Sequence, residues 1–162
     1  MKKLNISSFW RIFLVFLLIG TTSCLEMGLE ELPAFEDAEI TNVQFEFRYK
    51  DMNDLWIDGE PIVKVINLTV GDRVISSENG TVTCRLTVPA TNASFTADIR
   101  NGVSLQSIVG KFNISTGASI TPVGGAPQLG IPGDFSTPRT YNVIAADGTV
   151  KSWQITITNL TK

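Results

Sequence analysis

The sequence has no histidine and few charged residues for its length. Among its 162 residues, two are cysteines and only 18% are charged. The absence of histidine excludes a Ser-His-Asp or Cys-His catalytic centre, a histidine-ligated zinc site and an imidazole-based pH switch. The length suffices for one domain of ordinary size. The hydrophobic content of 43%, together with abundant Thr, Ser, Asn and Gly, favours a β-rich exported domain over a charged helical one.

The apolar run near the N-terminus, residues 12–20, is shorter than the ~20 residues that a transmembrane helix needs. Three basic residues precede it and small residues follow it, which is the plan of an export signal. Cys24, directly after those small residues, resembles the lipobox cysteine of bacterial lipoproteins, although Thr21 stands where leucine is usual. The resemblance implies that residues 1–23 are a signal peptide and that Cys24 carries lipid. An ordinary secreted protein and an uncut anchor are the alternatives.

The acidic surplus is confined to one segment. Loss of residues 1–23 would remove three basic groups, leaving 10 basic and 16 acidic side chains. Residues 24–39 contain six of the acids and no Lys or Arg: Glu26, Glu30, Glu31, Glu36, Asp37 and Glu39. We therefore expect residues 24–39 to be a solvated acidic tether and residues 40–162 to be a domain of balanced charge. Because no basic patch exists to neutralise phosphates, nucleic acid is not an expected partner.

The second cysteine, Cys84, has no partner in the chain if Cys24 carries lipid, so the sequence predicts no intramolecular disulfide. Apolar residues alternate with polar ones around Cys84, from Val82 to Val88. This pattern favours a buried, inert thiol over a reactive one.

Alternating apolar residues and turn signals predict short strands throughout residues 40–162. The expected strands are 40–50, 62–70, 81–88, 93–99, 111–115, 118–121, 140–146 and 150–158, with a short helical turn before 111. Closely spaced Gly and Pro indicate a long loop over 123–139. We expect an all-β fold, an antiparallel immunoglobulin-like β-sandwich of about seven strands, with a closed barrel as the alternative.

The C-terminal residues carry a second resemblance. Asp134-Phe135-Ser136 leads into the strand Tyr141-x-Val143-x-Ala145, then Asp147-Gly148, then a last strand with Trp153 and Ile155. This pattern resembles the C-terminal hairpin of immunoglobulin-like or cadherin-like domains in Bacteroides-type surface lipoproteins. The resemblance implies a small surface lipoprotein associated with glycan handling, and alternation places the motif residues in the core.

Trp56 is the tryptophan without an evident structural role. An aromatic face flanked by carboxylates suits sugar binding, because C–H bonds pack on the ring while hydroxyls donate to the acids. The candidate glycan-binding residues are Trp56, Asp54, Asp58 and Glu60. The alternative is a hairpin loop whose tryptophan covers the edge of the core.

The same loop allows two other interpretations, a calcium site and a hydrolytic site. Its hard oxygen donors are of the kind that calcium prefers, although they do not follow the EF-hand pattern. The calcium candidates are Asp51, Asn53, Asp54 and Asp58. Paired carboxylates could also hydrolyse glycosides, with Asp54 and either Asp58 or Glu60 as the pair, but nothing indicates a shielded acid.

Together these patterns predict a non-catalytic outer-membrane lipoprotein, anchored through lipid on Cys24 and exposed at the cell surface. The expected function is accessory glycan binding in a polysaccharide uptake system, with no cofactor. The alternative function is a structural, adhesin-like or protein-interaction module, whose partner would be another surface protein.

Overall fold

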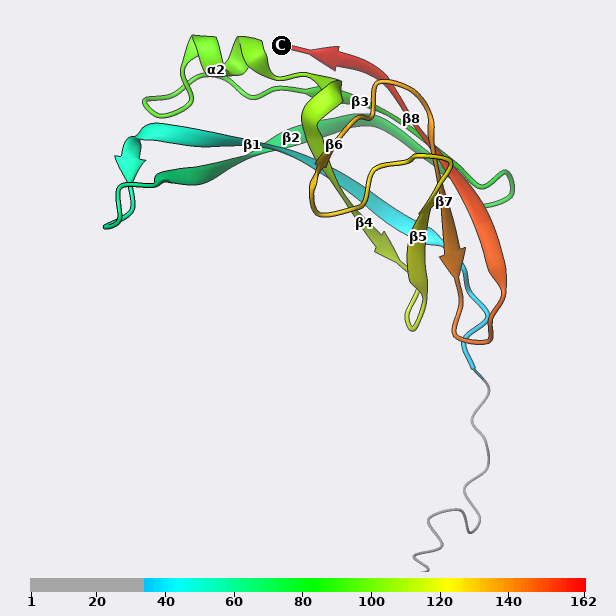
Figure 1. Cartoon of the computed structure of the whole chain (residues 1–162). Helices are drawn as coiled ribbons and strands as arrows, with labels where there is room; N and C mark the ends of the chain where they lie inside the picture. The colour runs from blue at the N-terminus through cyan, green and yellow to red at the C-terminus, as the bar shows by residue number, and fades with distance from the viewer. Residues whose placement is uncertain (1–33) are drawn as a thin grey trace, which may run out of the picture. The chain divides into compact units, whose positions relative to one another are not determined.

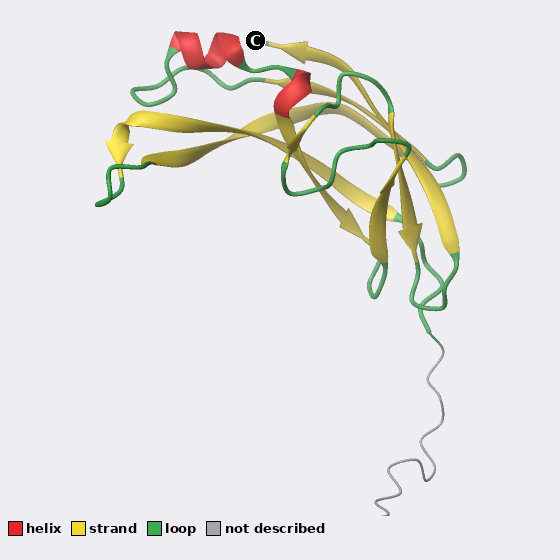
Figure 2. Cartoon of the chain, viewed as in Figure 1, coloured by secondary structure: helices red, strands yellow, loops and turns green. Residues whose placement is uncertain are grey.

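Residues 34–162 are described by the structure, a computed structural model, and they form an all-β domain (Figures 1 and 2). The predicted signal peptide, Cys24 and the first part of the predicted tether lie outside the described residues. The strands are β1 (Ile40–Leu55), β2 (Pro61–Ser76), β3 (Thr81–Thr87), β4 (Ile108–Ile114), β5 (Ser119–Val123), β6 (Pro132–Gly133), β7 (Arg139–Ile144) and β8 (Val150–Thr161). Two short helices, α2 (Ala97–Gly102) and the 3-10 helix η1 (Leu105–Ser107), lie between β3 and β4.

The strands form one curled sheet with the order β5-β7-β8-β3-β2-β1-β4-β6 (Figure 1). The all-β prediction is confirmed, and the C-terminal hairpin forms as expected, with Tyr141 opposite Trp153. One pairing differs from the expected antiparallel arrangement, because β3 and β8 run parallel. The immunoglobulin-like topology stays a prediction.

The core lies inside the curl of the sheet and is built from both of its halves. Phe45 on β1 packs edge-on against Phe135, with ring centroids 5.4 Å apart. Phe112 on β4 meets Tyr141 on β7 in the same way at 5.3 Å. Edge-to-face aromatic pairs add to the stabilisation from buried area. Because these strands lie far apart in the order of the sheet, the aromatic contacts hold the curl closed.

The last part of the predicted tether, residues 34–39, packs against the domain. Ala38 is buried, and its carbonyl accepts a hydrogen bond from the indole N–H of Trp153 at 2.9 Å. The side chain of Glu39 forms an ion pair with Lys151 at 2.5 Å. Contacts with the core therefore begin before the first strand.

The expected strand over 93–99 is wrong, because these residues form a turn and the start of helix α2. Asn92 accepts hydrogen bonds from the backbone N–H groups of Ser94 and Phe95, which closes a turn. Thr96 then caps the helix by accepting from the N–H of Ile99 at 3.4 Å. An N-terminal cap satisfies a helical N–H that would otherwise lack a partner. Local hydrogen bonding thus overrides the alternation of apolar residues.

The first two strands are longer than their sequence patterns predict. β1 continues five residues beyond position 50, and β2 continues six residues beyond position 70. The added length places the β1–β2 turn at the end of a hairpin that extends past the neighbouring strands (Figure 1). The expected long loop over 123–139 contains the two-residue strand β6, which pairs with β4.

Candidate functional site

Trp56 lies at the tip of the β1–β2 hairpin and is 62% exposed. Two backbone bonds fix the turn: the N–H of Trp56 donates to the carbonyl of Glu60 at 2.8 Å, and the N–H of Gly59 donates to the carbonyl of Trp56 at 2.9 Å. Gly59 has a φ of +86°, which glycine adopts without steric strain. The turn thus presents the indole to solvent and does not cover the core.

Several exposed apolar residues lie on the same hairpin as Trp56. A hollow of about 300 Å³ is lined by Trp56, Ile57 and Asp58. The exposed apolar residues of this end of the hairpin are Met52, Leu55, Trp56, Ile57, Val63 and Val65. We call this set the apolar tip. Exposed apolar side chains gathered at one end of a hairpin favour an interaction surface.

The carboxylates predicted to accompany Trp56 divide into two groups. Asp51 is buried and Asp54 is half-exposed, and both form ion pairs with the ammonium group of Lys64, at 2.7 Å and 3.2 Å. Hydrogen bonds from Lys64 and from the N–H of Asn53 hold the pKa of Asp51 below its usual value. Asp51 is therefore a structural anion at the base of the tip.

Asp58 and Glu60 lie in the turn and are exposed. The carboxylate of Asp58 accepts a hydrogen bond from the N–H of Glu60 at 3.2 Å, which supports the turn. Asp58 also lines the hollow beside Trp56, whereas Glu60 does not. The structure thus brings Trp56 and Asp58 together as the sequence predicted, while Asp54 is held by Lys64.

The calcium candidates gain no support from the geometry. Lys64 places its ammonium group between Asp51 and Asp54, two of the four proposed ligands. In the part of the chain that the structure describes, no group of three or more acidic or cysteine side chains is arranged to hold a metal ion.

The thiol of Cys84 is buried and unbonded, as the alternation around it predicts. Burial raises the pKa of this thiol to about 11, so it is protonated at neutral pH. Because the thiolate is the nucleophilic form, the geometry favours an inert core residue.

One buried charge was not visible in the sequence. Glu46 on β1 is 3% exposed, and it forms ion pairs with Arg48 and with Lys111 on β4, both at 2.5 Å. Burial raises the pKa of Glu46, but hydrogen bonds from Lys111 and Arg48 outweigh it and leave the pKa below its usual value. Alternation places Glu46 on the polar face of β1, and its burial between Arg48 and Lys111 could not be anticipated from local pattern. Arg48 also connects this cluster to the loop before β6 by donating to the carbonyl of Gly130 at 2.9 Å.

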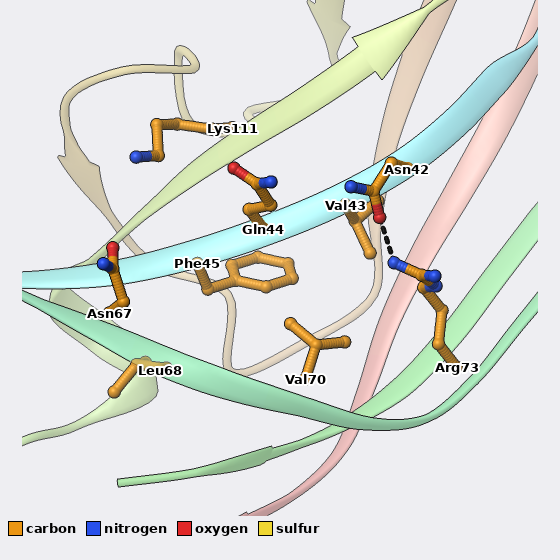
Figure 3. Close-up of a pocket in the computed structure, with 9 residues that line it drawn as sticks. All are labelled: Asn42, Val43, Gln44, Phe45, Asn67, Leu68, Val70, Arg73 and Lys111. Carbon is orange, nitrogen blue, oxygen red and sulfur yellow. Dashed lines mark hydrogen bonds between the residues drawn. The ribbon is translucent and has the colours of Figure 1, made fainter. Parts of the chain in front are cut away.

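A groove between β1 and β2 was also missed, because it arises where two strands separate. It has a volume of about 430 Å³ (Figure 3). Its lining consists of Asn42, Val43, Gln44, Phe45, Asn67, Leu68, Val70, Arg73 and Lys111. The only trace of this groove in the sequence is the set of amide side chains on both strands. Their spacing is the same as that of polar residues on a solvent-exposed strand face, so it does not predict a groove.

Among residues 34–162, no helix is both long and apolar enough to cross a bilayer.

Comparison with solved structures gives matches that include two proteins from Bacteroides species. A crystal structure of a candidate secreted protein from Bacteroides fragilis is 40% identical, covers 80% of this chain and all of that chain, and has a TM-score of 0.71. A candidate glycoside hydrolase from Bacteroides thetaiotaomicron is 21% identical over 82% of this chain and 27% of that chain, with a TM-score of 0.44. No curated protein matches.

The first match confirms the relationship to Bacteroides-type proteins that the C-terminal pattern predicted. The assignment as a lipoprotein stays a prediction, since Cys24 lies outside the described residues. A family model matches residues 40–156, which include every strand from β1 to β7 and the first half of β8. The chain therefore belongs to the DUF5018-related family.

Proposed function

We propose that this protein is a non-catalytic, lipid-anchored protein of the outer-membrane surface that binds glycans through the tip of the β1–β2 hairpin. The observation that carries the proposal is the exposure of Trp56 at a turn fixed by backbone hydrogen bonds. Tryptophan offers a large contact area with only two side-chain torsions to immobilise, so a ligand that stacks on it loses less free energy to side-chain ordering than it would on a long flexible side chain.

The surroundings of Trp56 provide the polar part of a sugar site. Asp58 is in the same hollow, and the exposed carboxylate of Glu60 is two residues away. Carboxylate oxygens accept hydrogen bonds from sugar hydroxyls, while the sugar C–H face packs on the indole. The hollow is open and shallow, which suits a polymer chain better than a small enclosed substrate. This openness supports binding without catalysis.

The location at the cell surface has separate support. The similar Bacteroides fragilis protein is described as a candidate secreted protein. The N-terminal residues of this chain resemble a lipoprotein signal that ends at Cys24. An acidic segment between the lipid and the domain would be repelled by anionic membrane surfaces, which would hold the domain away from the bilayer.

The lipid anchor predicts an all-or-none result in Bacteroides cells that express the full chain. Cys24→Ala should abolish incorporation of radiolabelled palmitate. Cys84→Ala is the matched control, because it removes the other cysteine without touching the signal, and it should leave palmitate incorporation unchanged. Palmitate incorporation into Cys24→Ala, or none into the parent protein, would contradict the anchor.

Glycan binding is tested by affinity electrophoresis of the full chain in gels that contain starch, xylan, pectin or mucin. At least one polysaccharide should retard the protein, and Trp56→Ala should weaken that binding by ~10-fold, equivalent to about 1.4 kcal/mol. Trp56→Tyr keeps an aromatic face and should retain most of the binding. Retardation by none of the polysaccharides would refute the function, and retardation unchanged in Trp56→Ala would refute the site.

A protein partner is the second candidate, and the apolar tip favours it. Met52, Leu55 and Ile57 are aliphatic or thioether side chains that stack poorly on sugars, yet they are exposed beside Trp56. Trp56→Leu separates the two functions, because leucine keeps apolar contact but removes the ring. A glycan site would lose affinity in Trp56→Leu and tolerate Ile57→Ser, whereas a protein contact would show the reverse order.

A further inference from the structure

The two longest strands separate halfway along their length. β1 and β2 pair from the hairpin tip as far as Phe45 and Leu68. Beyond that pair, the start of β1 pairs only with β4, while the second half of β2 pairs only with β3. A register shift between Gly71 and Val74 accompanies the separation, and Asp72 has a φ of +48°. Each strand thus has one edge without a strand partner where it faces the groove.

The groove has a rigid floor and polar walls. Its floor is formed by side chains that belong to the core, including Val43, Phe45 and Leu68. Figure 3 shows Asn42 and Arg73 in contact at one end, Asn67 toward the other end, and Gln44 between them. Its volume of about 430 Å³ lies in the range of small-molecule sites, ~300–1,000 Å³. Because the core fixes the floor, the walls are held at a defined separation.

The walls carry three amides and one cation without a carboxylate partner. Side-chain amides both donate and accept hydrogen bonds, which matches the two roles of a hydroxyl group. Among the ion pairs of residues 34–162, Lys111 is engaged by the buried Glu46, and Asp72 is engaged by Arg85 at 3.2 Å. Arg73 is in none of these pairs, and its guanidinium donates to the amide oxygen of Asn42.

A guanidinium in this position selects for a planar anion. Arginine presents its N–H donors in a fixed fork that matches the two oxygens of a carboxylate. The hydrogen bond to Asn42 uses one donor and orients the group at the end of the groove. The remaining donors are available to a ligand that fills the groove.

We propose that this groove is a second binding site, specific for a small hydroxyl-rich carboxylate such as an acidic monosaccharide. Arg73 binds the carboxylate, and the amides of Gln44 and Asn67 bind hydroxyl groups across the groove. The site is about six residues of extended strand from the hairpin turn, or ~20 Å. It does not rest on the function proposed for Trp56.

Isothermal titration calorimetry of the full chain in mild detergent at low salt tests this site. The ligands are glucuronate and galacturonate, with glucose, galactose and inorganic phosphate as comparisons. A uronate should bind at least ~10-fold more tightly than the matching neutral sugar. Arg73→Gln should reduce the affinity for the uronate to that of the neutral sugar, and Asn67→Ala should weaken binding of both. Because Arg73 and Asn67 are exposed, both variants should unfold at the same temperature as the parent.

Lys50→Gln is the matched control, because it removes the same charge from an exposed position of β1 outside the groove. It should leave uronate binding unchanged. The site would be refuted by the absence of uronate binding, by equal affinity for neutral sugars, by equal losses in Arg73→Gln and Lys50→Gln, or by tighter binding of phosphate. Trp56→Ala should not affect uronate binding, so failure at the hairpin tip and failure at the groove are distinguishable.

Discussion

Trp153→Ala is expected to lower the free energy of unfolding by about 3–5 kcal/mol, the range measured for large-to-small replacement of a core aromatic residue. The side chain of Trp153 is fully buried on β8, opposite Tyr141 on β7. Its indole N–H also holds the carbonyl of Ala38, so the substitution removes the anchor of the segment that precedes β1. Such a loss is a large share of the ~5–15 kcal/mol by which a domain is stable.

Urea denaturation followed by circular dichroism measures this effect. Trp56→Ala is the matched control, since it deletes the same side chain from an exposed position, and its unfolding free energy should stay within ~0.5 kcal/mol of the parent. A loss of less than about 1 kcal/mol in Trp153→Ala would contradict the central position of this residue in the core.

Gly80→Ala is expected to destabilise the domain by about 2–4 kcal/mol, through backbone strain and a steric clash. Gly80 has a φ of +60°, and a Cβ atom there would lie 2.3 Å from the carbonyl oxygen of Ser152. The backbone of Ser152 cannot shift away from this Cβ atom as easily as the end of a flexible side chain could. The carbonyl of Gly80 also accepts a hydrogen bond from the N–H of Gln154 at 2.8 Å, so displacement would disturb the junction of the β2–β3 turn with β8.

Gly124→Ala separates the two contributions. Gly124 has nearly the same φ, +61°, but a Cβ atom there would meet nothing within 4 Å. Its substitution should therefore report the conformational penalty alone, about 1 kcal/mol. The two unfolding free energies, measured under identical conditions, should differ by at least ~1 kcal/mol. Equal values would show that the chain relaxes around the clash at Gly80.

Local sequence pattern predicted some strands correctly and one strand wrongly. The alternation of Tyr141 and Val143, the Asp147-Gly148 turn and the alternation around Trp153 predicted β7 and β8 correctly. The same rule failed over 93–99, where side-chain caps from Asn92 and Thr96 redirect the backbone. Alternation reports which residues can share a face, whereas capping hydrogen bonds decide whether the strand forms at all.

The candidate sites could likewise be predicted only in part from the sequence. The composition of the 51–60 segment indicated Trp56 as a candidate binding residue, because an aromatic group among carboxylates is chemically distinctive. Nothing in that segment indicated that Lys64, brought alongside by strand pairing, would engage Asp51 and Asp54. The groove at Arg73 was invisible for the same reason, since each of its walls belongs to a different strand.

The all-β class, most strand positions, the burial of Cys84 and the position of Trp56 in a turn could all be predicted from the sequence. These properties depend on residues close together in the chain, whose side-chain alternation and turn chemistry are fixed locally. Three features emerged only in the folded domain: the parallel pairing of β3 with β8, the burial of Glu46 between two cations and the separation of β1 from β2. Each of these depends on which distant strands meet, and that choice is made by the packing of the whole core.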